Sequence, residues 1–306
     1  MAINESLCFV QFMHPGREAK PERGASAIGW NDGPSHARKY LRCPGTYLDG
    51  GNPVSGEMEF WGEWEPESEV LKEWEWQPNH GPQRVWRPYY QPRDNYAGLQ
   101  NTDPFVFGSF LYTGCKQYTH HGTRATQLRY LKRGSVLLFG SCIGGAFALD
   151  TVLVVNDWVD HNAANYRELL KGRVPEAYWD VTLFPWHREG NGGRVPDEGC
   201  QPPVVCAAPD SADASVRLYF GATYGDKVEG MFSFVPCQPA GKTKSGFARP
   251  AIELPGIIKG SNRQANKLNR QSNLSDVAEL WHKIKAQVQE EGLALGVSVE
   301  VPERRI

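Results

Sequence analysis

Two apolar segments on either side of a glycine turn constrain this fold more than any other part of the chain. Val136–Phe139 and Phe147–Val155 consist almost entirely of Val, Leu, Phe and Ala, and both are short. Such runs around a turn are typical of a buried β-hairpin. Just before them, Leu128 and Leu131 would share one face of a helix that Gly134 ends. The sequence therefore predicts a helix that leads into two paired, buried strands at the centre of a sheet.

Two central strands need further strands beside them, and the flanking chain supplies several. We predict an α+β fold: a mainly β mixed sheet or partly open barrel, with peripheral helices and long loops. With 306 residues, 40% of them hydrophobic, and no repeat or linker, we predict a single domain, 1–306. Its core is expected at about 103–158 and a C-terminal amphipathic helix at about 275–291. Further strands are predicted at 7–13, 57–64, 105–113, 178–184, 216–220 and 230–235, and a short helix at 162–171.

Composition and charge limit the classes of protein to which this chain can belong. The N-terminus lacks the basic and apolar regions of a signal peptide, and no stretch reaches 18 apolar residues, so we expect a cytoplasmic protein with no membrane partner. Seven cysteines without paired spacing favour free thiols. The net charge of −2 gives no general attraction to nucleic acid, but residues 242–270 are locally basic. They hold Lys242, Lys244, Arg249, Lys259, Arg263, Lys267 and Arg270 against Glu253 alone, which indicates either a basic face or an ordinary solvated surface.

His14 is the first candidate site residue, because it follows an apolar strand directly and is followed by Pro15 and Gly16. It either takes part in a site or only caps the strand. Glu63 and Glu65 follow the strand at 57–64 and are candidate catalytic carboxylates, which would stabilise an oxocarbenium-like centre while His14 holds the ligand.

Trp61 is a candidate ligand-binding residue. Alternation along 57–64 places it on the same side as Glu57, Glu59 and Glu63. A large ring on a polar face is a plausible stacking platform for a base. The alternative is that Trp61 packs under the proline-rich loop that follows.

Lys116, Gln117 and Arg249 complete the predicted ligand site. The strand at 105–113 ends in Gly-Cys-Lys-Gln, which brings a cation and an amide to a sheet edge. Lys116 would meet a phosphate or carboxylate, and Gln117 a base edge. Arg249 precedes Pro250 in an extended context that suits anion recognition.

One resemblance adds to this picture. The sequence QLRYLKRG, followed by SVLLFGS and FALDTVLVV within 127–155, resembles the helix, glycine turn and strand pair of PUA-like domains, which include the EVE and ASCH modules. The resemblance covers about a tenth of the chain, and Ser135 stands where that family often has an acidic residue. It implies a small β-barrel and binding of RNA or modified DNA bases. FWGEWEP, NTDPFVFG and YTGCKQ also resemble bacterial proteins, without implying an activity.

Metal ligation is a further alternative at His187, Cys200 and Cys206, with or without Cys237. Their spacing does not match the zinc deaminase pattern, so we predict no metal and no cofactor. The predicted function is therefore a protein that binds a nucleotide, a short single-stranded nucleic acid or a modified base. The alternative is an enzyme that acts on a nucleotide or NAD, such as an ADP-ribosyltransferase or N-glycosidase. A shared cleft for His14, a glutamate of the 57–64 strand and the 114–117 turn would favour the enzyme.

Overall fold

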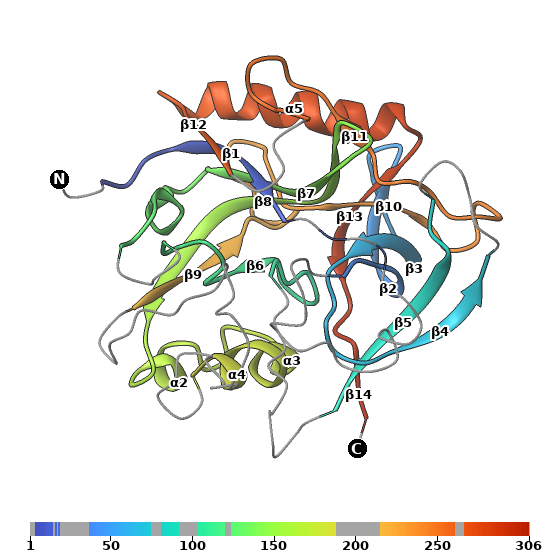
Figure 1. Cartoon of the computed structure of the whole chain (residues 1–306), viewed down its shortest axis with the longest axis horizontal. Coiled ribbons are helices and arrows are strands. Elements are labelled where there is room, and N and C mark those ends of the chain that lie inside the picture. The colour runs from blue at the N-terminus through green and yellow to red at the C-terminus, as the bar shows by residue number, and fades with distance from the viewer. Residues whose placement is uncertain are drawn as a thin grey trace.

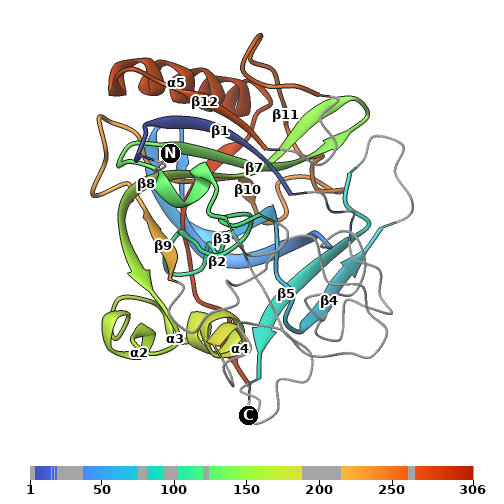
Figure 2. The same cartoon turned by 60° about the vertical axis from the view of Figure 1, so that its left-hand side comes forward.

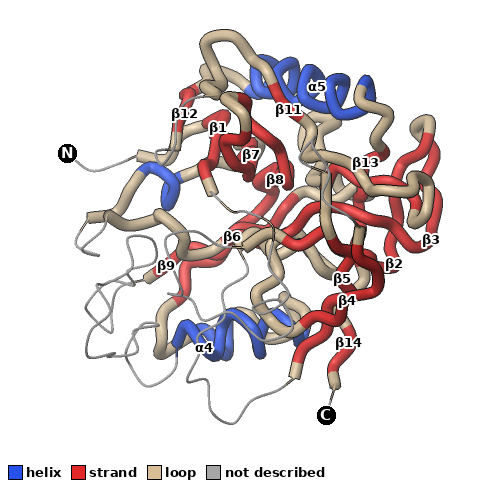
Figure 3. Tube along the Cα trace, turned by 45° about the vertical axis from the view of Figure 1, so that its right-hand side comes forward, coloured by secondary structure: helices blue, strands red, loops and turns tan. Residues whose placement is uncertain are grey.

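The computed structural model describes residues 4–14, 16, 18, 37–74, 81–91, 103–119, 124–187, 215–260 and 266–305, with only the backbone at 185 and 186. The fold is a β-rich α+β fold with two mixed sheets (Figure 1). Figure 3 separates the strand-rich layers from the helices at their periphery. The strands are β1 (Cys8–Met13), β2 (Lys39–Asp49), β3 (Asn52–Gly62), β4 (Ser68–Glu73), β5 (Arg84–Tyr90), β6 (Leu111–Tyr112), β7 (Val136–Ile143), β8 (Ala146–His161), β9 (Val216–Gly221), β10 (Val235–Pro239), β11 (Ala251–Ile252), β12 (Lys267–Arg270), β13 (Ala294–Val299) and β14 (Glu303–Arg304).

The predicted hairpin is confirmed as the centre of the first sheet, whose strand order is β12-β1-β7-β8-β9-β6, with β11 beside β8. β7 pairs antiparallel with β8 and parallel with β1. Leu137, Phe139, Leu149, Val152 and Val154 are at most 1% exposed. Apolar side chains on both faces of these strands account for their central position, because each face is covered by another layer.

The second sheet has the strand order β13-β10-β3-β2-β5-β14, with β4 beside β5. An additional pairing of β13 with β2 closes β2, β3, β10 and β13 into a ring. The largest apolar cluster takes side chains from both sheets and fills the space between them. A second cluster lies on the other face of the first sheet. There α5 (Leu274–Glu290) buries Val277, Trp281, Ile284 and Val288, as its predicted stripe requires (Figure 2).

The predicted helix at 128–134 is reduced to one 3₁₀ turn, η1 (Gln127–Tyr130). Leu131 leaves that turn in an extended conformation and forms a bridge to Ser6, so Gly134 ends no helix. Its φ of +86° instead serves the tight turn into β7.

Two further element predictions are corrected by the structure. Residues 178–184 are not a strand: they belong to α3 (Glu176–Tyr178), a π-helical turn η2 (Trp179–Leu183) and α4 (Phe184–His187). The predicted strand at 105–113 is regular only in β6, with isolated bridges at Phe105 and Phe107. The short helix predicted at 162–171 is confirmed in its middle, as the single turn α2 (Tyr166–Leu169).

Candidate functional site

Three chain segments at the junction of the two sheets meet around His14. His14 follows β1 directly, and its backbone N–H donates to Gly140 of β7. Lys39 at the start of β2 pairs with Gly62 at the end of β3. The residues next to this pair, Arg38 and Glu63, therefore lie side by side. The antiparallel β2–β3 register therefore brings a cation and a carboxylate to the end of β1.

His14, Glu63 and Arg38 form a buried ionic cluster. His14 Nδ1 lies 2.8 Å from Glu63 Oε2, and Arg38 Nη1 lies 3.0 Å from the same oxygen. All three side chains are 1% exposed. Arg38 Nη2 also donates to the backbone oxygen of His14 at 2.6 Å. A carboxylate held against Nδ1 of an imidazole, with Nε2 on the other side of the ring, is the pairing that general-base histidines use.

Asp150 and Arg249 extend the cluster across β8. Arg38 Nε lies 2.9 Å from Asp150 Oδ2, and Arg249 Nη1 lies 3.4 Å from Asp150 Oδ1. Ser141 connects the two halves, since its Oγ donates to His14 O at 3.0 Å and accepts from Arg249 Nη1 at 3.2 Å. Burial disfavours the charge of Arg38, but Glu63 and Asp150 outweigh it and raise the pKa of Arg38. Burial lowers the pKa of Arg249 more than Asp150 raises it.

Trp61 lies beside this cluster but presents no open ring face. It is 3% exposed, its Nε1 donates to Phe247 O at 2.8 Å, and Tyr40 packs against it edge-on. The guanidinium of Arg249 lies 5.1 Å from the centre of the indole. The residues at the end of β3 are buried on both sides because loop 246–250 covers the side that alternation assigned to solvent. Trp61 thus acts in this structure as a support for Arg249.

Lys116 reaches the same region, whereas Gln117 does not. Lys116 Nζ donates to the backbone oxygen of Met13 and, at 3.3 Å, to Asn266 Oδ1. Gln117 turns to β9 and is fully buried, with Nε2 donating to Arg217 O at 2.6 Å and Oε1 accepting from Arg217 N at 2.9 Å. Because Gln117 is fully buried and both ends of its amide bond the backbone of Arg217, it is out of reach of a base edge. Gln117 is therefore a structural residue in this arrangement.

Glu65 and Asp103 place further carboxyl groups near the cluster. Glu65 is 2% exposed, and its charge raises the pKa of Arg38 and of Lys39. For Lys39 burial is the larger effect, and its pKa falls to about 7. Asp103 accepts backbone N–H groups of the 113–115 turn, and burial, the Cys115 thiol and Glu63 hold its pKa well above the usual range.

Sequence reasoning missed Arg38, Ser141 and Asp150. Asp150 carried a signal, because it is the one charged residue within the apolar run Phe147–Val155, and a buried carboxylate requires a partner. Arg38 and Ser141 carried none, since an arginine before a strand and a serine within one are both common. Their role depends on a register that only the structure supplies.

The residues considered for metal ligation do not form a metal site within the described part of the chain. No group of three or more possible ligands occurs there. His187 Nε2 instead lies 3.0 Å from His161 Nδ1, and its ring stacks on Tyr166. Burial lowers the pKa of His161 to about 4 and that of His187 to about 3. Cys237 is buried in β10, and Cys200 and Cys206 lie outside the described residues.

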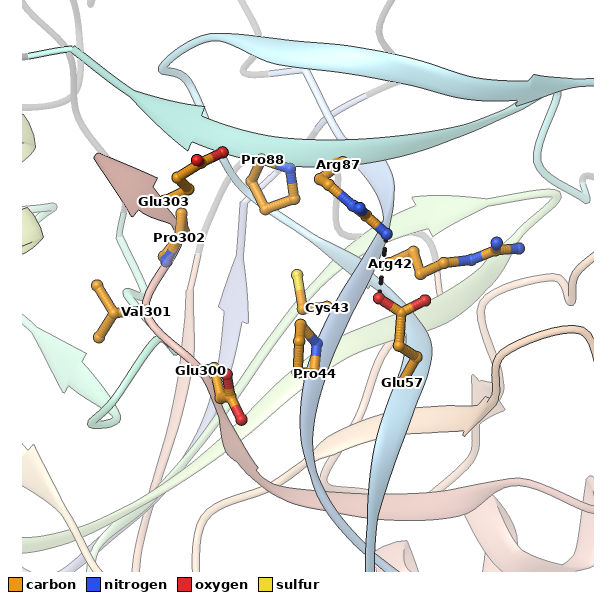
Figure 4. Close-up of a pocket in the computed structure, with 10 residues that line it drawn as sticks. All are labelled: Arg42, Cys43, Pro44, Glu57, Arg87, Pro88, Glu300, Val301, Pro302 and Glu303. Atoms are coloured by element: carbon orange, nitrogen blue, oxygen red, sulfur yellow. Dashed lines mark hydrogen bonds and ion pairs between the residues drawn. The ribbon is translucent and has the colours of Figure 1, made fainter. Parts of the chain in front are cut away.

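A pocket of about 280 Å³ opens elsewhere, between β2, β5 and the segment before β14 (Figure 4). Arg87 and Glu57 form a 3.0 Å ion pair on one side of it, and Arg42 pairs with Glu59. Its positive charges are thus already compensated, and it contains none of the predicted site residues. It is lined by Arg42, Cys43, Pro44, Glu57, Arg87, Pro88, Glu300, Val301, Pro302 and Glu303.

Comparisons with known proteins give no identity. The chain matches no protein-family model, no curated protein and no solved structure. Within the part of the chain that the structure describes, no helix is long and apolar enough to cross a membrane.

Proposed function

We propose that this chain is an enzyme that acts on a nucleotide at the His14–Glu63 pair. The observation that carries the proposal is the 2.8 Å contact between the His14 imidazole and the Glu63 carboxylate, buried next to two guanidinium groups. Buried titratable groups held in specific pairs concentrate at functional sites, because burying charges without a task is costly. The joint presence of His14, Glu63 and Lys116 at one place supports the enzyme over a simple binding protein.

The chemistry that fits these groups is cleavage of an N-glycosidic bond, by hydrolysis or by transfer of the ribosyl group. The bond from C1′ to the base nitrogen breaks, the base leaves with the bonding electrons and gains a proton, and water or an acceptor hydroxyl takes its place on C1′. His14 Nε2 exchanges the proton, while Glu63 or Glu65 stabilises the positive charge that develops on the sugar. Arg249 and Lys116 supply positive charge for the substrate's phosphate.

A nucleotide or nucleic-acid binding protein without catalysis is the second candidate function. Arg249, held against the Trp61 ring, favours it, since a guanidinium on an indole face is a preorganised anion-binding group. We also propose that the β7–β8 hairpin corresponds to the hairpin of PUA-like domains. We further propose that the protein works in the cytoplasm.

Turnover assays separate these candidates. The purified protein would be incubated with NAD, nucleoside monophosphates and short oligonucleotides, and released bases would be measured by liquid chromatography and mass spectrometry. Glu63→Gln and His14→Gln should each lower turnover about 10² to 10⁴-fold, the range of general acid–base catalysis. Glu57→Gln, on the same strand but in an exposed pair with Arg87, is the matched control and should retain activity. Binding without turnover by the wild type would support the binding protein, and neither binding nor turnover would contradict both.

A further inference from the structure

β12 forms an exposed basic edge of the first sheet. Among the described residues it pairs with β1 alone and is the last strand in the sheet order, so no described strand pairs with its outer backbone groups. Lys267 begins this strand, Arg270 ends it, and Lys259 lies on the turn beside it; these three residues are called the basic edge below. Lysine on an edge strand often has one simple role, which is to prevent strand pairing between molecules. Two further features go beyond that role.

The first feature is the placement of two lysines together, with no counter-ion from the described part of the chain. Both polar atoms of the Gln11 side chain bond the backbone of Lys259, at 2.8 and 3.0 Å, and Gln11 is also the strand partner of Lys267. Lys259 and Lys267 are therefore fixed at the same level of β1. Partial burial and the charge of Lys259 lower the pKa of Lys267. Lys267 Nζ donates to the backbone oxygen of Gly256, but neither lysine forms an ion pair with a described residue, so an anion placed between them would relieve their repulsion.

The second feature is a direct connection to the proposed site. Asn266, which precedes Lys267, accepts the Met13 N–H at 3.0 Å and contacts Lys116 Nζ at 3.3 Å through the same oxygen. Met13 immediately precedes His14. The basic edge therefore begins where the His14 site ends, and Lys116 lies between them.

The length of this path decides which ligand it fits. Arg270 pairs with Cys8 in the β1–β12 register, five residues from Met13, and it projects from the opposite face of the sheet to Lys267, so the path follows the rim between the two faces. At about 3.3 Å per residue this is about 16 Å. A single strand in stacked geometry places one phosphate about every 3.4 Å, so the path covers about four or five phosphates. A free nucleotide in the His14 site cannot reach Arg270.

We infer that the substrate of the proposed site is a single-stranded nucleic acid whose phosphates lie along the basic edge while one nucleotide occupies the His14 site. This inference rests on the proposed function and names its substrate class. The net charge of −2 argues against tracking along a long duplex, because the attraction is confined to this edge.

The test compares Lys259→Gln/Lys267→Gln with Lys171→Gln/Lys242→Gln, which removes the same charge from exposed lysines after α2 and after β10. Binding of a fluorescein-labelled eight-nucleotide single strand and of AMP would be measured between 50 and 300 mM salt. Each phosphate contact of a single strand contributes about 0.7 to the slope of log K against log salt, so the first variant should lose about 1.4. At low salt its oligonucleotide affinity should fall at least tenfold, with AMP affinity unchanged. The control should match the wild type for both ligands.

Equal oligonucleotide affinity and salt slope in both double variants would overturn the inference, as would wild-type binding of AMP as tight as that of the oligonucleotide. A duplex bound as tightly as the single strand would also overturn it. Failure of the proposed function is distinguishable. If the oligonucleotide binds along the basic edge but is never cleaved, and Glu63→Gln changes nothing, the enzyme is refuted and the binding path stands.

Discussion

Arg38→Met is the substitution that most directly tests the ionic cluster. Arg38 is fully buried and contacts Glu63 at 3.0 Å, Asp150 at 2.9 Å and the His14 backbone oxygen at 2.6 Å. Methionine fills a similar volume without charge. The variant would leave two buried carboxylates without their shared counter-ion and one buried carbonyl without its donor.

The expected loss follows from the burial of the cluster. Removing one partner of a buried ion pair costs about 3 to 5 kcal/mol, because the remaining charge stays desolvated. The matched control is Arg87→Met, which removes an arginine whose pair with Glu57 is 43% exposed on each side. Pairs of that exposure contribute about 0 to 1 kcal/mol. Arg38→Met should therefore lower the free energy of unfolding by at least about 2 kcal/mol more than Arg87→Met does, which is the gap between these two ranges.

Urea unfolding followed by tryptophan fluorescence at pH 7.5 measures both variants. The double variant Arg38→Met/Glu63→Gln should lose less than the sum of its single variants, because each substitution removes part of the other's cost. It also provides a folded reference if Arg38→Met alone unfolds. Equal losses in Arg38→Met and Arg87→Met, or strict additivity in the double variant, would refute the cluster as described.

Four further predictions test other parts of the structure. Unfolded histidine binds protons near pH 6.5 but folded His161 only near 4, so stability should fall as pH drops from about 6.5 towards 4, by about 2 kcal/mol at pH 5. In urea unfolding at pH 7.5 and 5.0, His161→Gln should remove that share, and an unchanged pH dependence would count against the buried pair. Gln117→Ala should lower the free energy of unfolding by about 1 to 3 kcal/mol, because the buried backbone N–H and C=O of Arg217 lose their partner. Its affinity for AMP, measured by titration, should equal that of the wild type. Gly134→Ala should lower the melting temperature, with a cost of about 1 to 3 kcal/mol, because φ is +86° and a Cβ would lie 2.1 Å from Leu274. Elemental analysis should find no stoichiometric zinc, and one zinc per chain would contradict this.

The sequence was most informative where a local pattern and the tertiary environment agree. The apolar runs at 136–139 and 147–155 are buried on both faces, so their composition identifies them without knowledge of their neighbours. The amphipathic helix α5 was also predicted correctly, because its buried residues recur at helical spacing along one face. The predicted start at about residue 275 is one residue late, because Asn273 accepts the Asp276 N–H and caps a helix that begins at Leu274.

Other predictions failed where tertiary contacts decide. Tyr178–Phe184 contains good strand formers, yet it follows Pro175 and Glu176, which favour the start of a helix, and no strand of the described chain pairs with it. Alternation placed Trp61 on a solvated face, but loop 246–250 arrives from nearly 190 positions later in the chain and covers it. No local pattern encodes such a contact.

The cost of the cluster is itself an argument for function. Replacing a whole buried ionic network by apolar residues of similar volume is commonly neutral or stabilising, so stability alone gives no reason to bury Arg38, Glu63, Asp150, Arg249 and His14 together. Specifying strand register is one alternative reason, but the β2–β3 hairpin already pairs eleven residues, with the apolar end of β3 buried. His14 and its neighbours also lie next to Lys116 and to Asn266, at the start of the basic edge. A site that pairs a histidine with a carboxylate, beside Arg249 and Lys116, has the charge distribution that a phosphorylated substrate requires.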